Sequence, residues 1–414
     1  MGDDRATALD LTQLLESVED APPVDAVDVL ARRLAEALGA TEVSFLIADL
    51  SGSALVRLEH AGADDATRTR GRETAARVPI ADTPQGRTLT GQRVEVEDGP
   101  DGVRVFAPVT NRGEAIGVLE VVLPGAPEEQ TIADLGRAAH ALAYVLIANR
   151  RFTDLFAWGQ RSVPLSLAAE IQHRLLPPAF TCESGQCTLS AWLEPAGDVG
   201  GDTFDFILDR DLLHLSMTDA MGHDVASAIL ATVLVGALRN ARRAGLSLAG
   251  QARTGSAALF DYIGDGSFVT GQLVRIDLRT ETATVVNAGH PRPLRLRDGA
   301  VAEIALEPDP PFGTVPGHAY RTQALAFEPG DRVLFFTDGI IDDAPGAVDL
   351  AAHLLETAHL HPREAVQSLV RTVRVAAGGP LRDDATAMCV DWHGGGTQPR
   401  TSDGGADEAA ASSA

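Results

Sequence analysis

Aspartates that stand beside glycine or a second aspartate recur four times between Trp192 and Trp392. The segments are VGGDTFDF around Asp202, TDAMGHD around Asp219, FFTDG around Asp338 and RDDAT around Asp383. A single Asp-Gly pair is ordinarily a turn. Four such places indicate a cluster that binds Mg²⁺ or Mn²⁺ through oxygen. A pair of these ions could activate water for in-line attack on phosphorus.

Hydrophobic strands position these carboxylates. A strand over Leu212–Thr218 ends at Asp219, and a long apolar helix follows. A second strand over Val333–Phe336 precedes Asp338, and Asp383 opens the last strand of the chain. An aspartate just past a strand points its carboxylate out at the end of the sheet, and a neighbouring glycine lets backbone or ions approach.

The first part of the chain has a different order of elements. Apolar spacing predicts two helices, a strand, two neighbouring strands joined by a turn at Asn111–Gly113, and a long helix. Their ranges are Leu9–Val18, Val27–Leu38, Glu42–Ala48, Val103–Val109, Ala115–Leu123 and Glu128–Phe156. Gly39 stands where a glycine is expected to end the second helix.

The segment between the two parts carries an apolar stripe of Leu165, Ala168, Ile171 and Leu175, which a proline pair ends. It is either a connector packed on the next domain or a dimerising helix that transmits a signal. Cys182 and Cys187 have no second cysteine pair nearby, so two inert thiols are favoured over a zinc site. After Trp392 the composition predicts a disordered tail.

Composition narrows the function classes. The 414 residues carry 34 Arg plus Lys, 58 Asp plus Glu and a formal charge of −24, and no lysine is present. The charge argues against nucleic acid as a partner. The missing lysine excludes a Schiff-base or P-loop lysine. We expect no membrane span and no signal peptide, and therefore a cytoplasmic protein.

Three further motifs accompany the aspartates: EIQHRLLPP at Glu170–Pro178, NAGHPRPLRL at Asn287–Leu296 and FEPGDRVLFFTDGIID at Phe327–Asp342. With the four acidic segments, they resemble the metal-dependent (PPM-type) serine/threonine phosphatases in their bacterial SpoIIE/RsbU branch. The resemblance covers about Leu165 to Trp392. It implies two packed antiparallel sheets flanked by helices, an α-β-β-α domain, with two Mn²⁺ or Mg²⁺ ions in a cleft.

The resemblance also implies roles for single residues. Asp202 and Asp219 match the central metal ligands, Asp219 bridges both ions, and the Ala220 carbonyl fills a further position. Asp338 and Asp383 complete one metal site. Asp384 is a less favoured ligand than Asp383, and His290 would fix a loop. Asp198 stands where the branch usually has Glu, and it would act through water. His223 lies in Gly-His-Asp, where the branch commonly reads Gly-Lys-Gly or Gly-His-Gly. His223 either donates a proton to the leaving serine oxygen or caps the following helix.

The first part, about Asp25 to Asn149, resembles a GAF sensor domain in the order of its elements. A structural or dimerising role is as well supported as the sensing of a small-molecule ligand. No cysteine precedes Cys182, which excludes a covalently attached bilin in this domain. A homodimer formed through the sensor and linker helices is expected.

The predicted fold class is α+β, with a GAF-like α/β sensor domain ahead of the phosphatase domain. The boundaries are an N-terminal segment 1–23, sensor 24–150, linker helix 151–180, phosphatase 181–393 and tail 394–414. The resemblance implies hydrolysis of phosphoserine or phosphothreonine on an anti-sigma-factor antagonist. The alternative is a catalytically weak binding module that sequesters its partner.

Overall fold

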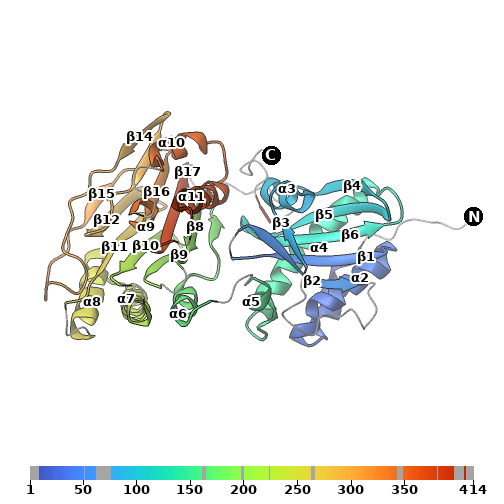
Figure 1. Cartoon of the computed structure of the whole chain (residues 1–414), viewed down its shortest axis with the longest axis horizontal. Helices are drawn as coiled ribbons and strands as arrows, with labels where there is room; N and C mark the ends of the chain where they lie inside the picture. Colours follow the sequence, from blue (N-terminus) through green and yellow to red (C-terminus); the bar gives the residue numbers. More distant parts are fainter. Residues whose placement is uncertain are drawn as a thin grey trace, which may run out of the picture. The chain divides into compact units, whose positions relative to one another are not determined.

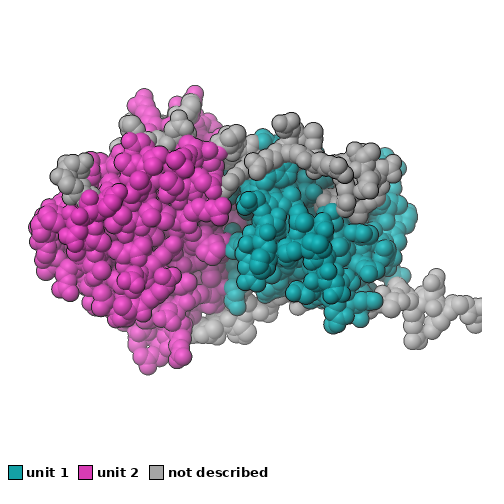
Figure 2. Space-filling model, turned by 90° about the horizontal axis from the view of Figure 1, so that it is seen from below, with its two compact units in different colours: residues 1–164, 400–414 teal, residues 165–399 magenta. Residues whose placement is uncertain are grey.

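The chain forms two compact units, residues 1–164 with 400–414 and residues 165–399 (Figure 2). The structure is a computed structural model. It describes residues 9–50, 52–61, 76–160, 165–196, 200–222, 224–262, 266–342, 348–379, 381–395 and 405–406.

Unit 1 is built on one six-stranded antiparallel sheet of order β3-β2-β1-β6-β5-β4 (Figure 1). Its strands are β1 Glu42–Ala48, β2 Ala54–Ala61, β3 Arg77–Pro79, β4 Glu95–Gly99, β5 Gly102–Asn111 and β6 Glu114–Leu123. Its helices are α1 Leu11–Glu19, η1 Pro23–Asp25, α2 Ala26–Leu38, α3 Pro84–Gly91, α4 Glu129–Asn149 and α5 Leu155–Gly159.

The main core of unit 1 lies between the sheet and helices α1, α2 and α4. Leu30 and Leu34 of α2 and Leu135 and Leu142 of α4 are fully buried there against Phe45 of β1. Helix α3 covers the other face with a smaller cluster around Leu89 and Phe106. The strands therefore alternate their apolar residues between two faces, as a sheet covered on both sides requires.

The predicted elements of unit 1 are present. Helix α2 ends at Gly39, whose φ of 61° lies in the left-handed region that glycine favours. The β5–β6 turn is where the sequence places it. The long helix differs, because it ends at Asn149, whose side-chain amide donates to the Val145 carbonyl (2.9 Å). The apolar pattern beyond it continues in the separate helix α5.

Unit 2 contains two antiparallel sheets. Their orders are β15-β12-β11-β10-β9 and β14-β13-β16-β17-β8-β7. The strands are β7 Thr181–Glu183, β8 Cys187–Glu194, β9 Asp202–Asp209, β10 Leu212–Ala220, β11 Val269–Asp277, β12 Thr282–Ala288, β13 Leu294–Arg297, β14 Ala300–Glu303, β15 Gln323–Leu325, β16 Arg332–Phe336 and β17 Ala385–Trp392. The helices are α6 Leu167–Leu175, α7 Val225–Arg243, α8 Leu248–Tyr262, α9 Gly339–Asp342, α10 Leu350–Glu356 and α11 Pro362–Ala377.

Helices cover the outer faces of the two sheets of unit 2 (Figure 1), and an apolar cluster lies between each pair of neighbouring layers. The central cluster, with Phe204, Leu215, Val285, Phe335 and Val390, lies between the two sheets. Helices α7 and α8 bury a second cluster against the five-stranded sheet. Helices α10 and α11 bury a third against the six-stranded sheet. The observed layering is α-β-β-α, as the resemblance implies.

Two helices, α4 and α7, are long and apolar enough to cross a membrane by length and composition alone. In the qualifying stretch of α4, 50% of the residues are buried inside the protein, and 44% in that of α7. Both helices supply residues to the cores just described, and core helices of globular proteins commonly pass the same test.

Two short segments flank unit 2. The linker helix is shorter than its apolar stripe: α6 begins after Ser166, whose hydroxyl accepts from the Ala169 N–H (3.1 Å), and ends at Leu175. In the predicted tail, the Gly405 carbonyl accepts from the Gly113 N–H of unit 1 (3.1 Å). The tail residues around Gly405 and Ala406 lie outside the described ranges.

Candidate functional site

Asp202 and Asp219 are directly opposite each other on neighbouring strands. Asp202 is the first residue of β9 and Asp219 is the next to last of β10, and the antiparallel register pairs them. Asp202 is only 2% exposed. Like charges directly opposite in a buried strand pair repel. The pair therefore needs compensation from its surroundings.

Two threonines from the other sheet hold the Asp202 carboxylate. Its Oδ2 accepts from the hydroxyls of Thr337 (2.7 Å) and Thr386 (2.5 Å). Thr337 follows β16 and Thr386 lies in β17, and the Thr386 N–H donates to the Thr337 hydroxyl (3.1 Å). Asp202 thus ties the end of the five-stranded sheet to the six-stranded sheet.

Asp384 accepts hydrogen bonds from residues on both sides of the segment 197–199, which precedes β9. Its Oδ1 accepts from the Ala196 N–H (2.9 Å), and its Oδ2 accepts from the Gly201 N–H (3.1 Å) and from the side-chain amide of Gln172 (2.5 Å). The side chain is 1% exposed. Burial raises the pKa of Asp384, and these donors oppose the rise because they favour the charged carboxylate.

Gln172 connects the linker helix to this site. The residue lies in α6, is 1% exposed, and its Nε2 also donates to the Asp202 carbonyl (2.8 Å). Sequence reasoning missed this role, although Gln172 lies in the EIQHRLLPP motif. The available signal was a polar residue directly after Ile171 of the apolar stripe.

Asp219 lies near the remaining two predicted ligands. Its pKa is raised to about 8, first by burial and then by the charges of Asp338 and Asp383. The pKa of Asp202 is raised well above its ordinary value, first by burial and then by Asp219. The structure therefore brings Asp202, Asp219, Asp338 and Asp383 into one electrostatic neighbourhood.

Two glycines permit this close approach. A Cβ on Gly201 would lie 2.6 Å from the Ala220 carbonyl oxygen, and a Cβ on Gly339 would lie 2.0 Å from the Asp384 carbonyl oxygen. Both distances are shorter than non-bonded atoms allow. Glycine at these positions lets the strand ends pack backbone to backbone beside the carboxylates.

The donor set fits a hard divalent cation. It consists of carboxylate oxygens whose mutual repulsion an added positive charge would relieve. Within the described residues, no three or more Asp, Glu, His or Cys side chains are already grouped as a metal site. The Asp202 carboxylate is instead turned to the two threonines. Asp198 and His223 lie outside the described residues, and Asp224 caps α7 by accepting from the Ala226 N–H (2.7 Å).

The NAGHP segment forms a rigid loop at the edge of this neighbourhood. The Asn287 side chain accepts from the His290 N–H (2.8 Å) and donates to the His290 carbonyl (3.1 Å). The His290 Nδ1 is 2.9 Å from the Thr270 hydroxyl. Burial lowers the pKa of His290 to about 3, against an opposing effect of the Phe336 carbonyl, so the ring is neutral.

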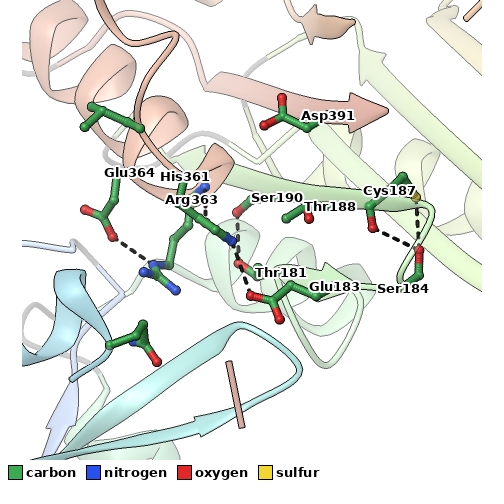
Figure 3. Close-up of polar contacts among 12 residues, drawn as sticks. Thr181, Glu183, Ser184, Cys187, Thr188, Ser190, His361, Arg363, Glu364 and Asp391 are labelled. Atoms are coloured by element: carbon green, nitrogen blue, oxygen red, sulfur yellow. Dashed lines mark hydrogen bonds and ion pairs between the residues drawn. The ribbon is translucent and has the colours of Figure 1, made fainter. Parts of the chain in front are cut away.

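A second buried polar cluster lies on β7, β8 and α11 (Figure 3). The Cys187 Sγ is 3.1 Å from the Ser184 hydroxyl, and burial raises its pKa to about 12. His361 caps α11 by accepting from the Arg363 N–H (3.1 Å), and its Nε2 is 3.5 Å from the Glu183 carboxylate. A thiol with so high a pKa stays protonated, and Cys182 and Cys187 form no disulfide.

Comparison with known families supports the resemblance in unit 2. Residues 209–393 match the family model described as "Stage II sporulation protein E (SpoIIE)". The match includes Asp219, Asp338 and Asp383, and Asp202 precedes it. It supports a SpoIIE-type phosphatase domain, whereas the GAF domain in unit 1 stays a prediction.

Individual relatives are distant. "Phosphoserine phosphatase RsbP" of Bacillus subtilis is 23% identical over 183 residues, which are 43% of this chain and 45% of the relative. "Protein IcfG" of Synechocystis is 24% identical over 219 residues, 44% of this chain and 33% of the relative. The chain thus matches less than half the length of either. The RsbU and RsbW domains of Rv1364c from Mycobacterium tuberculosis are 24% identical with a TM-score of 0.45, covering 54% of this chain and 63% of that one.

We predict that Gln172→Leu weakens both stability and any activity of this site. The substitution leaves the buried Asp384 carboxylate and the Asp202 carbonyl each short of a donor, a loss of about 1–3 kcal/mol in the free energy of unfolding. Urea denaturation measures it. The control is Arg174→Ala on the same helix, whose exposed pair with Glu170 contributes less than about 1 kcal/mol. Equal effects of the two substitutions would contradict the role given to Gln172.

We further predict that the metal-free protein loses stability as pH rises toward 8. The folded-state pKa of Asp219, about 8, lies above its ordinary value of 3.8. The folded state therefore keeps a proton that the unfolded state releases, and its stabilising effect disappears as pH rises through this range. Denaturation in a chelator between pH 5 and 8 should show a steeper loss for the wild type than for Asp219→Asn. Parallel pH curves for the two proteins would argue against the raised pKa.

Proposed function

We propose that this chain is a metal-dependent protein phosphatase that hydrolyses phosphoserine or phosphothreonine. The observation that carries the proposal is the Asp202–Asp219 pair, in which a buried Asp202 faces a partly buried Asp219 in register, with Asp338 and Asp383 close to Asp219. Buried carboxylates that repel one another are costly for stability alone. Their arrangement is understandable where a cation completes the site.

Asp202, Asp219, Asp338 and Asp383, with the Ala220 carbonyl, would hold two Mg²⁺ or Mn²⁺ ions. When bound, the ions supply Lewis acidity that lowers the pKa of water and offset charge on the phosphoryl oxygens. The absence of lysine leaves arginine, histidine and backbone N–H groups as the other contacts to the substrate.

The chain's own residues position and maintain this site. Thr337 and Thr386 orient the Asp202 carboxylate, and Asp384 accepts from the Gly201 N–H directly before β9. Asp219 has to lose its proton before it can act as a ligand, so binding of the cation should release protons. His223 is the proposed proton donor to the leaving serine oxygen.

The proposed substrate is a phosphorylated anti-sigma-factor antagonist. The support is the SpoIIE family match in unit 2 and the similarity of the chain to a phosphoserine phosphatase, RsbP. A small phosphoprotein of this kind would place the protein in a cytoplasmic partner-switching pathway that releases a sigma factor.

Unit 1 is proposed to act as a GAF-type sensor, with or without a small-molecule ligand, in a homodimer. Its signal would reach the site through α6. Gln172 would link α6 to the site, because its side-chain amide donates to both the Asp202 carbonyl and the Asp384 carboxylate. A displacement of α6 would remove two hydrogen bonds at the carboxylate cluster.

A binding module with little catalysis is the second candidate. It is favoured by the absence, within the described parts of the chain, of three side chains already grouped around an ion position. Such a protein would retain its partner and release no phosphate.

We predict that Asp219→Asn abolishes hydrolysis of p-nitrophenyl phosphate and of a phosphoserine peptide in the presence of Mn²⁺. Loss of a shared ligand to the ions should lower kcat by at least about a hundredfold. Phosphate release measures it. Asp211→Asn, at the opposite end of the β9–β10 hairpin, is the matched control and should keep wild-type rates.

A wild type that is inactive with Mn²⁺ and with Mg²⁺ would favour the binding module. Equal rates for Asp219→Asn and the wild type would refute the assigned site.

We also predict that deletion of residues 1–160 lowers basal activity several-fold. The truncated chain would keep α6 but lose unit 1, whose proposed signal acts on that helix. The deletion should have a smaller effect in the Gln172→Leu background if the two act through the same contact. Unchanged activity of the truncated chain would refute this regulatory route.

A further inference from the structure

A cavity of about 580 Å³ opens beside one of the proposed metal ligands. Asp338 contributes to its lining, together with Arg292 and Glu303. Pro291, Leu306, Pro308, Phe336 and Ile341 supply apolar surface. The volume is in the range of sites that bind molecules of drug size. It is several times larger than a phosphate group requires.

One wall of the cavity is fixed before any ligand arrives. The loop at Asn287–Pro291 is held by the Asn287 side chain, and the Gln272 amide donates to the Pro291 carbonyl (2.7 Å). Gly289 in this loop has a φ of 71°, a conformation that glycine adopts without strain. A preformed wall lowers the entropic cost of binding a flexible segment.

Arg292 leaves this rigid loop with one nitrogen still available. Its Nε donates to the Leu306 carbonyl (3.0 Å), and its Nη1 donates to the Glu303 carboxylate (2.9 Å). Among the described residues, its Nη2 has no acceptor. Arg292 is also the only cation among the described residues that line the cavity.

We propose that this cavity binds the polypeptide of the phosphoprotein next to the phosphoserine. An apolar side chain enters among Pro291, Pro308 and Ile341, and a backbone carbonyl accepts a hydrogen bond from Arg292 Nη2. The inference rests on the proposed function, because it needs a phosphoserine at the neighbouring carboxylates.

The lining favours a peptide over an additional phosphate. Ile341 is 43% exposed and Pro308 is exposed, so these two residues, rather than the buried Leu306 and Phe336, supply the accessible apolar surface. Apolar walls reward burial of an aliphatic side chain at roughly 25 cal/mol per Å². A second phosphate would find one partly neutralised guanidinium and two carboxylates, Glu303 and Asp338, which repel it.

The test compares three substrates on the full-length protein with Mn²⁺. Two are phosphoserine nonapeptides, one with leucines on both sides of the phosphoserine and one with glycines. The third is p-nitrophenyl phosphate, which has no polypeptide. The variant is Arg292→Ala. The control is Arg295→Ala, which removes a cation three residues away that does not line the cavity.

The wild type should have a kcat/KM about tenfold higher for the leucine peptide than for the glycine peptide. Arg292→Ala should lower kcat/KM for the leucine peptide roughly tenfold and leave the aryl phosphate rate within about twofold. Arg295→Ala should match the wild type on all three substrates. The unchanged aryl phosphate rate also reports that the variant is folded.

Three results would overturn the inference. An equal loss of kcat/KM on the leucine peptide and on the aryl phosphate would mean that Arg292 contacts the phosphate or is needed for folding. Equal wild-type rates on the two peptides would show that the cavity has no apolar subsite. An unchanged peptide rate in Arg292→Ala would show that Arg292 makes no hydrogen bond to the peptide. A wild type inactive on all three substrates would instead refute the proposed function itself.

Discussion

The placement of Asp202 directly opposite Asp219 is the constraint on which the candidate site in unit 2 depends. The antiparallel register places the two carboxylates opposite each other, and burial removes the water that would otherwise screen them. Hydrogen-bond donors from distant segments surround these carboxylates. Two threonine hydroxyls donate to Asp202, and backbone N–H groups and the Gln172 side-chain amide donate to Asp384. The two sheets meet at this point because Thr337 and Thr386 belong to the sheet opposite β9.

The number and kind of donors decide which carboxylates are satisfied inside the protein. Asp384 accepts from Gln172 and from main-chain N–H groups, each of which favours the charged form. The two hydroxyls on Asp202 do not offset its burial and its facing aspartate, and its pKa stays well above the ordinary value. Asp384 is thereby a positioning group, and the Asp202–Asp219 pair is the place where added positive charge brings the largest relief.

Much of the fold could be predicted from the sequence, because apolar periodicity and turn residues are local signals. The strand Glu42–Ala48, the end of α2 at Gly39 and the β5–β6 turn follow from these signals. The four acidic segments were also visible, and the structure brings Asp219 near Asp338 and Asp383. The contacts of Gln172 could not be predicted, since hydrogen bonds to Asp202 and Asp384 span 30 and 212 residues of sequence and no periodicity encodes them. The end of α4 at Asn149 could not be predicted either, because the apolar pattern continues into α5.

The composition acquires a structural meaning once the arginines are compared. In a chain without lysine every permanently charged side-chain cation is an arginine guanidinium. The strength of its interactions depends mostly on how many of its nitrogens have hydrogen-bond acceptors. Arg332 uses its fork on Asp391 and on the carbonyls of Thr357 and Leu360, and Arg297 uses its own on Asp331. The nitrogens of these two guanidiniums donate to acceptors within the protein. Arg292 differs because two of its nitrogens are held and the third faces no described acceptor, in a cavity that it shares with Asp338. The Arg292 side chain is 41% exposed, so water solvates its third nitrogen, and the proposed carbonyl of the substrate would replace that water beside Asp338.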